Sequence, residues 1–304
     1  MITLIADNKE IPVEWVEFSD GALTCKVLAE RGSYFTFGWL NVDPCTPCKQ
    51  ITTEIILLIE CLFELEIEVV ELNLHIPYLP YARADRIFEE GNTNPLGLFL
   101  SELLSLDIFY VVKCCDVHNL AAVEDYIKSC GDIEFPFEFV NVNQVSCFQY
   151  TCKRHNGYAQ KWDYVIAPDK GAKDKAKSIA DMLGVPVVQA SKERDIPTGR
   201  IIKTELDTTL PVGSRVIICD DIGDYCGTHI ALGEILKGMG CVVDLYVTHL
   251  IAPKGLSKLR GVFDKVYCYQ TVGGYINKTD VMVVLVISCL LYTSDAADER
   301  RRVG

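Results

Sequence analysis

The sequence of 304 residues lacks an excess of basic residues, a long apolar run and repeated metal-type cysteine spacing. It has 29 Lys and Arg against 42 Asp and Glu, which gives a formal net charge of −13. Binding to DNA or RNA requires clustered Lys and Arg to neutralise phosphates, so we expect no nucleic-acid partner. A local basic pocket for a small phosphorylated ligand is compatible with this balance.

No apolar segment is long enough for a membrane-spanning helix. The longest one, Val281 to Tyr292, is shorter than the roughly 20 residues that such a helix needs. The N-terminus carries acidic residues early and has no basic region followed by an apolar core, so it does not resemble a signal peptide. We therefore predict a cytoplasmic protein without a membrane partner.

Zinc-type or redox-type spacing is scarce although the chain has 14 cysteines. Cys45-x-x-Cys48 is the only pair at that spacing, and Cys25 and Cys61 are the other candidate ligands. In a large cytoplasmic chain, scattered cysteines favour free and mostly buried thiols, which is the interpretation we adopt.

The C-terminal segment, Cys289 to Gly304, resembles translated sequencing-adapter DNA residue by residue. We therefore expect the natural coding sequence to stop near Ser288, and we exclude this tail from fold reasoning. The alternative is a genuine charged tail with three successive arginines. For the chain as a whole, 49% hydrophobic and 23% charged residues are typical of a globular protein.

Strand-like and helix-like segments alternate, which predicts mainly parallel sheets flanked by helices. The expected strands cover residues 68–74, 109–113, 164–167, 215–219, 242–247 and 265–269, and a further strand begins at 187–188. The expected helices cover 55–63, 95–104, 172–182 and 229–237. Periodicity is weak between Cys130 and Tyr158, so we place a boundary there and predict two related α/β domains, 1–145 and 146–288, before the tail 289–304. Ligands of such sheets bind beyond the carboxyl ends of strands, where the polar clusters fall.

The most informative cluster is Asp220-Asp221-Ile-Gly-Asp224-Tyr-Cys-Gly-Thr228, which follows an apolar strand and precedes a helix. Amides at a helix N-terminus bind a phosphate, and Gly227 permits a close backbone approach while Thr228 adds a donor. Asp220 and Asp221 are then placed to accept hydrogen bonds from vicinal sugar hydroxyls. An ordinary turn with acidic N-caps is the alternative, but a cap does not need three aspartates.

This segment resembles the phosphoribosyl diphosphate-binding loop of type I phosphoribosyltransferases and ribose-phosphate diphosphokinases. Their usual form is two acids, two apolar residues and Asp-Thr-Gly-Gly-Thr or close to it. Gly223, Tyr225 and Cys226 depart from that pattern.

Other motifs resemble the diphosphokinases in particular, and they follow the family's order from about residue 50 to 270. They are Pro77-Tyr-Leu-Pro-Tyr-Ala-Arg-Ala-Asp-Arg86, Asp116-Val-His118, Pro168-Asp-Lys-Gly171 and Lys192-Glu-Arg194. The first has Ala84 where the family has Gln, and compact homologues of the kind found in phages share this form. Judged singly, residues 83–86 are typical of a surface ion-pair cluster, His118 of a core histidine, and residues 192–194 of a solvated charge run. Only the order of the segments along the chain favours a site.

The resemblance implies two tandem type I phosphoribosyltransferase-like domains and transfer of the diphosphoryl group of ATP to ribose 5-phosphate. It implies Mg²⁺ as the cofactor and a homo-oligomer built from dimers, commonly a hexamer. The residue roles that it implies are: catalysis by Lys192 and Arg194; ATP binding by Arg83, Asp85, Arg86 and His118; ribose 5-phosphate binding by Asp220, Asp221, Asp224, Tyr225, Cys226, Gly227 and Thr228; and metal binding by His118 and Asp169.

Two other functions stay open at this stage. A phosphoribosyltransferase uses the same loop, but it has only one such half and carries a hood for a nucleobase, which we do not find. A non-catalytic regulatory homologue is expected to lose the Lys-x-Arg or the acidic pair, whereas this chain keeps both.

Overall fold

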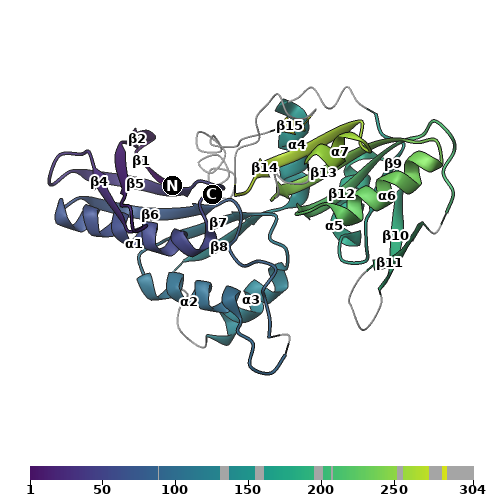
Figure 1. The fold of residues 1–304 in the computed structure, drawn as a ribbon. Helices are drawn as coiled ribbons and strands as arrows, with labels where there is room; N and C mark the ends of the chain where they lie inside the picture. The colour runs from purple at the N-terminus through teal and green to yellow at the C-terminus, as the bar shows by residue number, and fades with distance from the viewer. Residues whose placement is uncertain are drawn as a thin grey trace, which may run out of the picture. The chain divides into compact units, whose positions relative to one another are not determined.

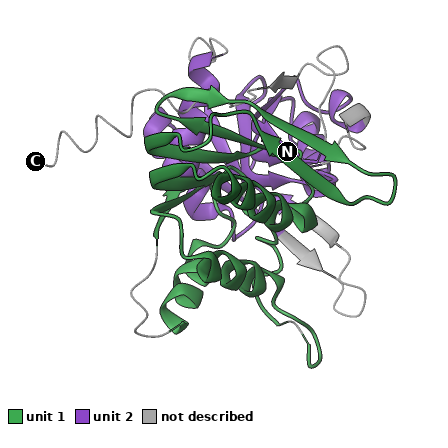
Figure 2. Cartoon of the chain, turned by 90° about the vertical axis from the view of Figure 1, so that its left-hand side faces the viewer, with its two compact units in different colours: residues 1–142, 288–304 green, residues 143–287 purple. Residues whose placement is uncertain are grey.

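The computed structural model describes residues 1–87, 89–130, 137–154, 161–194, 201–206, 208–251, 256–273 and 283–285. The chain divides into two compact units, residues 1–142 and 143–287, each with its own sheet (Figures 1 and 2). The predicted tail 289–304 lies outside the described residues. None of the described helices is long and apolar enough to cross a membrane.

Unit 1 is built on a six-stranded sheet of order β2-β1-β5-β6-β7-β8, in which β5 to β8 are parallel. Strands β3 and β4 form a separate antiparallel hairpin. The elements are β1 (Ile2–Ala6), β2 (Lys9–Ile11), β3 (Val13–Glu17), β4 (Leu23–Val27), β5 (Tyr34–Val42), α1 (Cys48–Glu64), β6 (Glu68–Ile76), α2 (Pro95–Leu106), β7 (Val111–Cys115), α3 (Leu120–Ser129) and β8 (Glu138–Val142).

Unit 2 is built on a seven-stranded sheet of order β11-β10-β9-β12-β13-β14-β15, parallel except for the edge strand β11. The elements are α4 (Gln144–Arg154), β9 (Tyr164–Ala167), α5 (Lys173–Leu183), β10 (Val187–Arg194), β11 (Ile201–Leu206), β12 (Arg215–Gly223), α6 (Gly227–Gly238), β13 (Val242–Leu250), α7 (Leu256–Arg260), β14 (Lys265–Thr271) and β15 (Val283–Leu285). The predicted α/β class with mainly parallel sheets is confirmed.

The central strand β12 shows why the unit 2 sheet is covered on both faces. Its residues alternate between two hydrophobic clusters, with Val216 and Ile218 in one and Ile217 and Cys219 in the other. Helix α6 contributes to the first cluster, and α4 and α5 contribute to the second. A strand buried on both faces reads as a continuous apolar run, which is the pattern that the sequence shows here.

The strands are longer than predicted at the ends that carry polar residues. β12 runs to Gly223 because its ladder with β13 continues past Asp220, whose register partner is Val247. β6 likewise runs two residues further, to Ile76. The acidic pair therefore lies in the second half of a strand, where the ladder holds its backbone, and not in a free loop.

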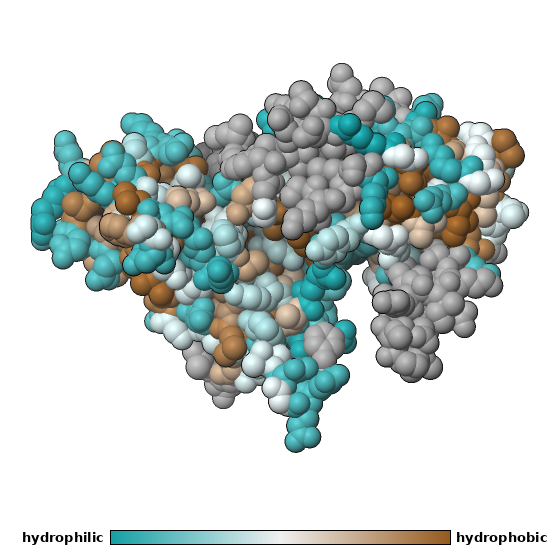
Figure 3. Space-filling model, viewed as in Figure 1, coloured by the Kyte–Doolittle hydropathy of each residue, from teal (hydrophilic) through white to brown (hydrophobic). Residues whose placement is uncertain are grey.

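Hydrophilic residues cover much of the visible surface of unit 1, with hydrophobic residues scattered between them (Figure 3). This is the surface expected of a chain with a net charge of −13.

Candidate active site

The first candidate segment, residues 77–86, follows the carboxyl end of β6. Its first residue is tied to the neighbouring strand β7, since the backbone N–H of Cys115 donates to the carbonyl of Pro77 at 3.2 Å. Further on, the N–H of Ala84 donates to the carbonyl of Tyr81 at 2.7 Å, and Tyr81 has a left-handed backbone with φ of 59°. A non-glycine residue keeps this conformation only where the surrounding structure holds it, and such residues concentrate at functional sites.

Asp85 links this segment to the turn after β7. Its Oδ2 accepts a hydrogen bond from Nδ2 of Asn119 at 2.6 Å, and its Oδ1 lies 3.6 Å from Nε of Arg86. Oδ1 of Asn119 also accepts from the N–H of Ala122 and caps α3. The sequence analysis missed Asn119, although an Asn directly before an apolar helix is a recognisable N-cap signal. Arg83 and Arg86 are both exposed, so their guanidinium groups are accessible to an anion.

The turn after β7 is fixed through its backbone. Asp116 is buried with φ of 40°, and its N–H donates to the carbonyl of Val142 at 2.7 Å. The N–H of Val117 donates to Oδ1 of Asn141 at 3.0 Å. His118 is exposed at the end of this turn. The predicted ATP-site residues of unit 1 therefore come from two loops at one edge of the sheet.

In unit 2, Asp169 lies in the turn between β9 and α5. Its Oδ1 accepts a hydrogen bond from the N–H of Ala172 at 3.0 Å, which shapes the turn ahead of the helix. Because β9 and β12 are parallel neighbours, Asp169 and Asp220 lie at the same edge of the sheet.

Each carboxylate of the acidic pair contacts its own basic side chain. Oδ2 of Asp220 lies 2.8 Å from Nε2 of His229, and Oδ2 of Asp221 accepts from Nζ of Lys175 at 2.9 Å. His229 comes from the first turn of α6 and Lys175 from α5. The sequence analysis missed both residues, because only the fold brings these two helices beside β12.

Electrostatics at this edge reflect crowded carboxylates. Burial raises the pKa of Asp220, the hydrogen bond to His229 lowers it, and the charges of Asp221 and Asp169 raise it again. For His229, burial is the largest cause and lowers the pKa, but the hydrogen bonds and charges of Asp220 and Cys226 together outweigh it and raise the pKa from 6.5 to about 10. His229 is therefore protonated at neutral pH, and the site keeps a surplus of negative charge that attracts cations.

The predicted phosphate loop runs from Asp224 to Thr228 and leads into α6. Cys226 precedes the helix in a left-handed conformation with φ of 54°, and its thiol is buried, whereas Tyr225 is 68% exposed. A Cβ added at Gly227 would meet nothing within 4 Å, so the backbone faces open space there. First-turn amides have no intrahelical acceptor, and they point towards that space.

The catalytic pair proposed from the sequence, Lys192 and Arg194, lies near the end of β10. This strand pairs in antiparallel fashion with β11, and Lys192 is in register with Thr204. Side chains of both residues, and residues 195–200, lie outside the described part of the chain. Their role stays a prediction.

Comparison with known proteins places this architecture among characterised families. Residues 147–272 match the model of the phosphoribosyl transferase domain. Ribose-phosphate pyrophosphokinase of Pyrococcus abyssi is 28% identical over 280 residues, which cover 91% of this chain and 90% of the relative. That of Thermococcus kodakarensis is 26% identical over 292 residues, covering 92% and 93%. The chain is therefore similar to ribose-phosphate pyrophosphokinases over about nine tenths of its length.

A solved structure has a similar fold over most of the chain. The crystal structure of phosphoribosylpyrophosphate synthetase from Mycobacterium smegmatis matches with a TM-score of 0.69 at 18% identity, covering 96% of this chain and 90% of that one. This likeness confirms the predicted fold of two tandem phosphoribosyltransferase-like sheets.

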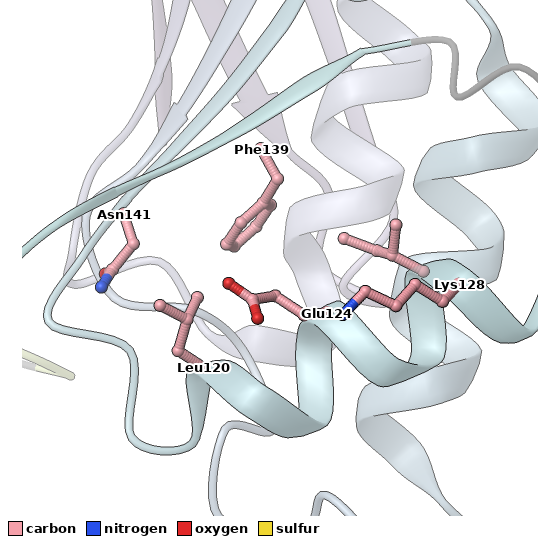
Figure 4. A pocket seen from close by; sticks show the side chains of 6 residues that line it. Leu120, Glu124, Lys128, Phe139 and Asn141 are labelled. Atoms are coloured by element: carbon pink, nitrogen blue, oxygen red, sulfur yellow. The ribbon is translucent and has the colours of Figure 1, made fainter.

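A separate pocket of about 360 Å³ lies in unit 1, between α3 and β8 (Figure 4). Leu120, Glu124 and Lys128 line it from α3, and Phe139 and Asn141 from β8. None of the predicted site residues lines it. One of its lining residues, Asn141, also holds the turn after β7, so this pocket borders that turn.

Proposed function

We propose that this chain transfers the diphosphoryl group of ATP to the 1-hydroxyl of ribose 5-phosphate. The hydroxyl oxygen attacks the β-phosphorus, the bond from that phosphorus to the α,β-bridging oxygen breaks, and AMP leaves. The products are phosphoribosyl diphosphate, AMP and the hydroxyl proton. The observation that carries this proposal is the acidic pair of β12, held by its own cations directly ahead of the α6 N-terminus.

Unit 2 supplies the ribose 5-phosphate site in this proposal. The loop of Asp224, Tyr225, Cys226, Gly227 and Thr228 binds the 5-phosphate through backbone amides and the Thr228 hydroxyl. Asp220 and Asp221 accept hydrogen bonds from the vicinal ribose hydroxyls. His229 and Lys175 each contact one carboxylate oxygen, so they orient the pair towards the sugar.

Unit 1 supplies the ATP site. Arg83 and Arg86 are exposed planar cations suited to phosphate oxygens, and Asp85 lies beside Arg86. His118 is exposed at the turn after β7 and contacts the nucleotide phosphates.

Lys192 and Arg194 stabilise the charge that develops on the transferred group, since phosphoryl-type transfer depends mainly on positioning and charge neutralisation.

A single carboxylate at the unit 2 edge, Asp169, suits a magnesium ion that takes its other ligands from water and substrate, since the described residues contain no group of three or more candidate metal ligands. Asp169 is a carboxylate whose Oδ1 is oriented by a backbone amide, and carboxylate oxygen is the ligand that Mg²⁺ prefers. The neighbouring carboxylates leave a negative surplus that a cation relieves, as the raised pKa of Asp220 indicates. Bound Mg²⁺ supplies charge neutralisation of the ATP phosphates. The family resemblance implies metal-binding roles for Asp169 and for His118, each directly or through water.

The test is phosphorus NMR of the chain with ATP, Mg²⁺ and ribose 5-phosphate. We expect AMP and a new diphosphate ester to appear together, and Asp221→Asn to abolish both. Asp181→Asn is the matched control, because it breaks the exposed Lys177–Asp181 ion pair on the same helix, α5, that bears Lys175. Binding of both substrates without turnover would favour a chain that has lost part of its machinery, and binding of neither would favour a regulatory homologue.

We also propose that the chain acts in the cytoplasm as a homo-oligomer built from dimers. The family resemblance supports this assembly. Light scattering after size exclusion tests it, and a monomer at assay concentration would contradict it.

A further inference from the structure

Two cysteines that the proposed function does not use lie in contact in unit 1. Cys25 is in β4 and Cys61 is in α1, and their sulfur atoms are 3.4 Å apart. The thiol of Cys61 also donates to the backbone carbonyl of Cys25, with an S···O distance of 3.3 Å. The two residues are 36 positions apart in the chain, so the fold alone brings them together.

The contact lies between the β3–β4 hairpin and the helix that supports it. The hairpin forms its own two-stranded sheet and shares no ladder with the six-stranded sheet. Packing against α1 and the hydrogen bond from Trp15 Nε1 to the carbonyl of Ile2, at 3.0 Å, hold it to the rest of unit 1. Trp15 is the register partner of Cys25. A covalent bond at this position would therefore tie the hairpin to α1.

We propose that Cys25 and Cys61 form a reversible disulfide when the protein meets a peroxide. One thiol is oxidised by hydrogen peroxide to a sulfenic acid, and one water is released. The second thiol then attacks that sulfur, forms the S–S bond and releases a second water. Two thiols and one peroxide thus give one disulfide and two waters.

Burial first, and then the neighbouring Cys61, raise the pKa of Cys25 to about 12, so this thiol is protonated at neutral pH. The disulfide is the same whichever of the two thiols is oxidised first. The sulfur atoms must approach from 3.4 Å to about 2.05 Å to form the bond.

The bond would close a loop of 36 residues and restrict the unfolded chain. A native disulfide over such a loop raises the melting temperature of a unit of this size by roughly 5–10 °C. Reduction reverses the gain.

The experiment treats the reduced full chain with an equimolar amount of hydrogen peroxide, alkylates the remaining thiols and maps the peptides by mass spectrometry without reduction. We expect one cross-linked peptide joining Cys25 to Cys61, lighter by two hydrogens and cleaved by dithiothreitol. Cys25→Ser and Cys61→Ser each remove the cross-link and the rise in melting temperature. The matched control, Cys45→Ser, removes a thiol of the CxxC pair and keeps both effects.

Alkylation of both residues after peroxide treatment would overturn the proposal. So would a stable sulfinic acid on either residue, or a dominant cross-link from either residue to another cysteine. Mapping of the wild-type chain distinguishes these outcomes by itself, so the test does not depend on the folding of a serine variant.

Discussion

Two of the three departures from the usual phosphate loop, Gly223 and Cys226, lie against each other. A Cβ added at Gly223 would lie 3.0 Å from Sγ of Cys226, 3.2 Å from Cδ1 of Leu250 and 3.2 Å from Cγ1 of Val247. All three distances are shorter than a comfortable carbon contact, and the shortest is to the thiol. The thiol of Cys226 therefore occupies the volume that an apolar side chain at position 223 would need. We predict that the two positions are energetically coupled.

Gly223→Ala alone should destabilise unit 2 by about 1–3 kcal/mol, because it overpacks a tight site. Cys226→Ala removes the sulfur and relieves the closest of the three contacts. In that background we expect Gly223→Ala to cost about 1 kcal/mol less than in the wild type, since contacting residues couple by this order. The contacts to Leu250 and Val247 remain, so the rescue is partial.

Backbone strain is separated from this clash by a further variant, Cys226→Gly. Cys226 has φ of 54°, and a non-glycine residue in the left-handed region costs about 1 kcal/mol or more. Cys226→Gly should therefore have a free energy of unfolding about 1 kcal/mol higher than that of Cys226→Ala. The greater conformational freedom of glycine in the unfolded chain reduces this difference.

Urea unfolding of the wild type, Gly223→Ala, Cys226→Ala and the double variant gives the coupling energy between the two positions. The fluorescence of Trp162 reports the unfolding of unit 2. Trp15 and Trp39 of unit 1 are replaced by Phe in every sample, so that the fluorescence follows one unit. A coupling energy within about 0.3 kcal/mol of zero would refute the shared-space argument, since that is the additivity expected of independent sites.

Three more predictions concern residues that position the site. Asn119→Ala should raise the KM for ATP about tenfold, because the hydrogen bond to Asp85 is lost. Asn119→Ser should raise this KM equally but keep the α3 cap, and thus the melting temperature. An unchanged KM in both variants would contradict the positioning role of Asn119. The raised pKa of His229 contributes to the free energy of unfolding in full below pH 6.5, and this contribution is lost as the pH rises towards 10. Urea titrations should therefore show a free energy of unfolding that falls across that pH window, and a flatter pH profile for His229→Gln. Lys175→Met removes the cation that contacts the Asp221 carboxylate. It should raise the KM for ribose 5-phosphate about tenfold and change the KM for ATP little. Equal effects on the two KM values would argue for general misfolding.

The sequence alone identified the family motifs and the strands that carry them. Strand 164–167 matches β9 residue for residue, and the polar clusters follow or end β6, β7, β9 and β12 as predicted. These elements were predictable because buried parallel strands are continuous apolar runs that stop abruptly at polar residues. The N-terminal strands β1 to β5 and helices α3 and α4 were not assigned, because short or half-exposed segments carry weak periodicity.

Local pattern therefore predicted the fold class of this protein, its acidic pair and the loop that we propose binds phosphate. Only the tertiary structure supplied the partners of those residues: Asn119 for Asp85, His229 for Asp220, Lys175 for Asp221 and Cys61 for Cys25. Each of these partners lies in a helix, or caps one, that packs beside the strand or loop of the other residue. Periodicity reports which face of an element is buried, but the identity of the residue across that face depends on how the elements pack.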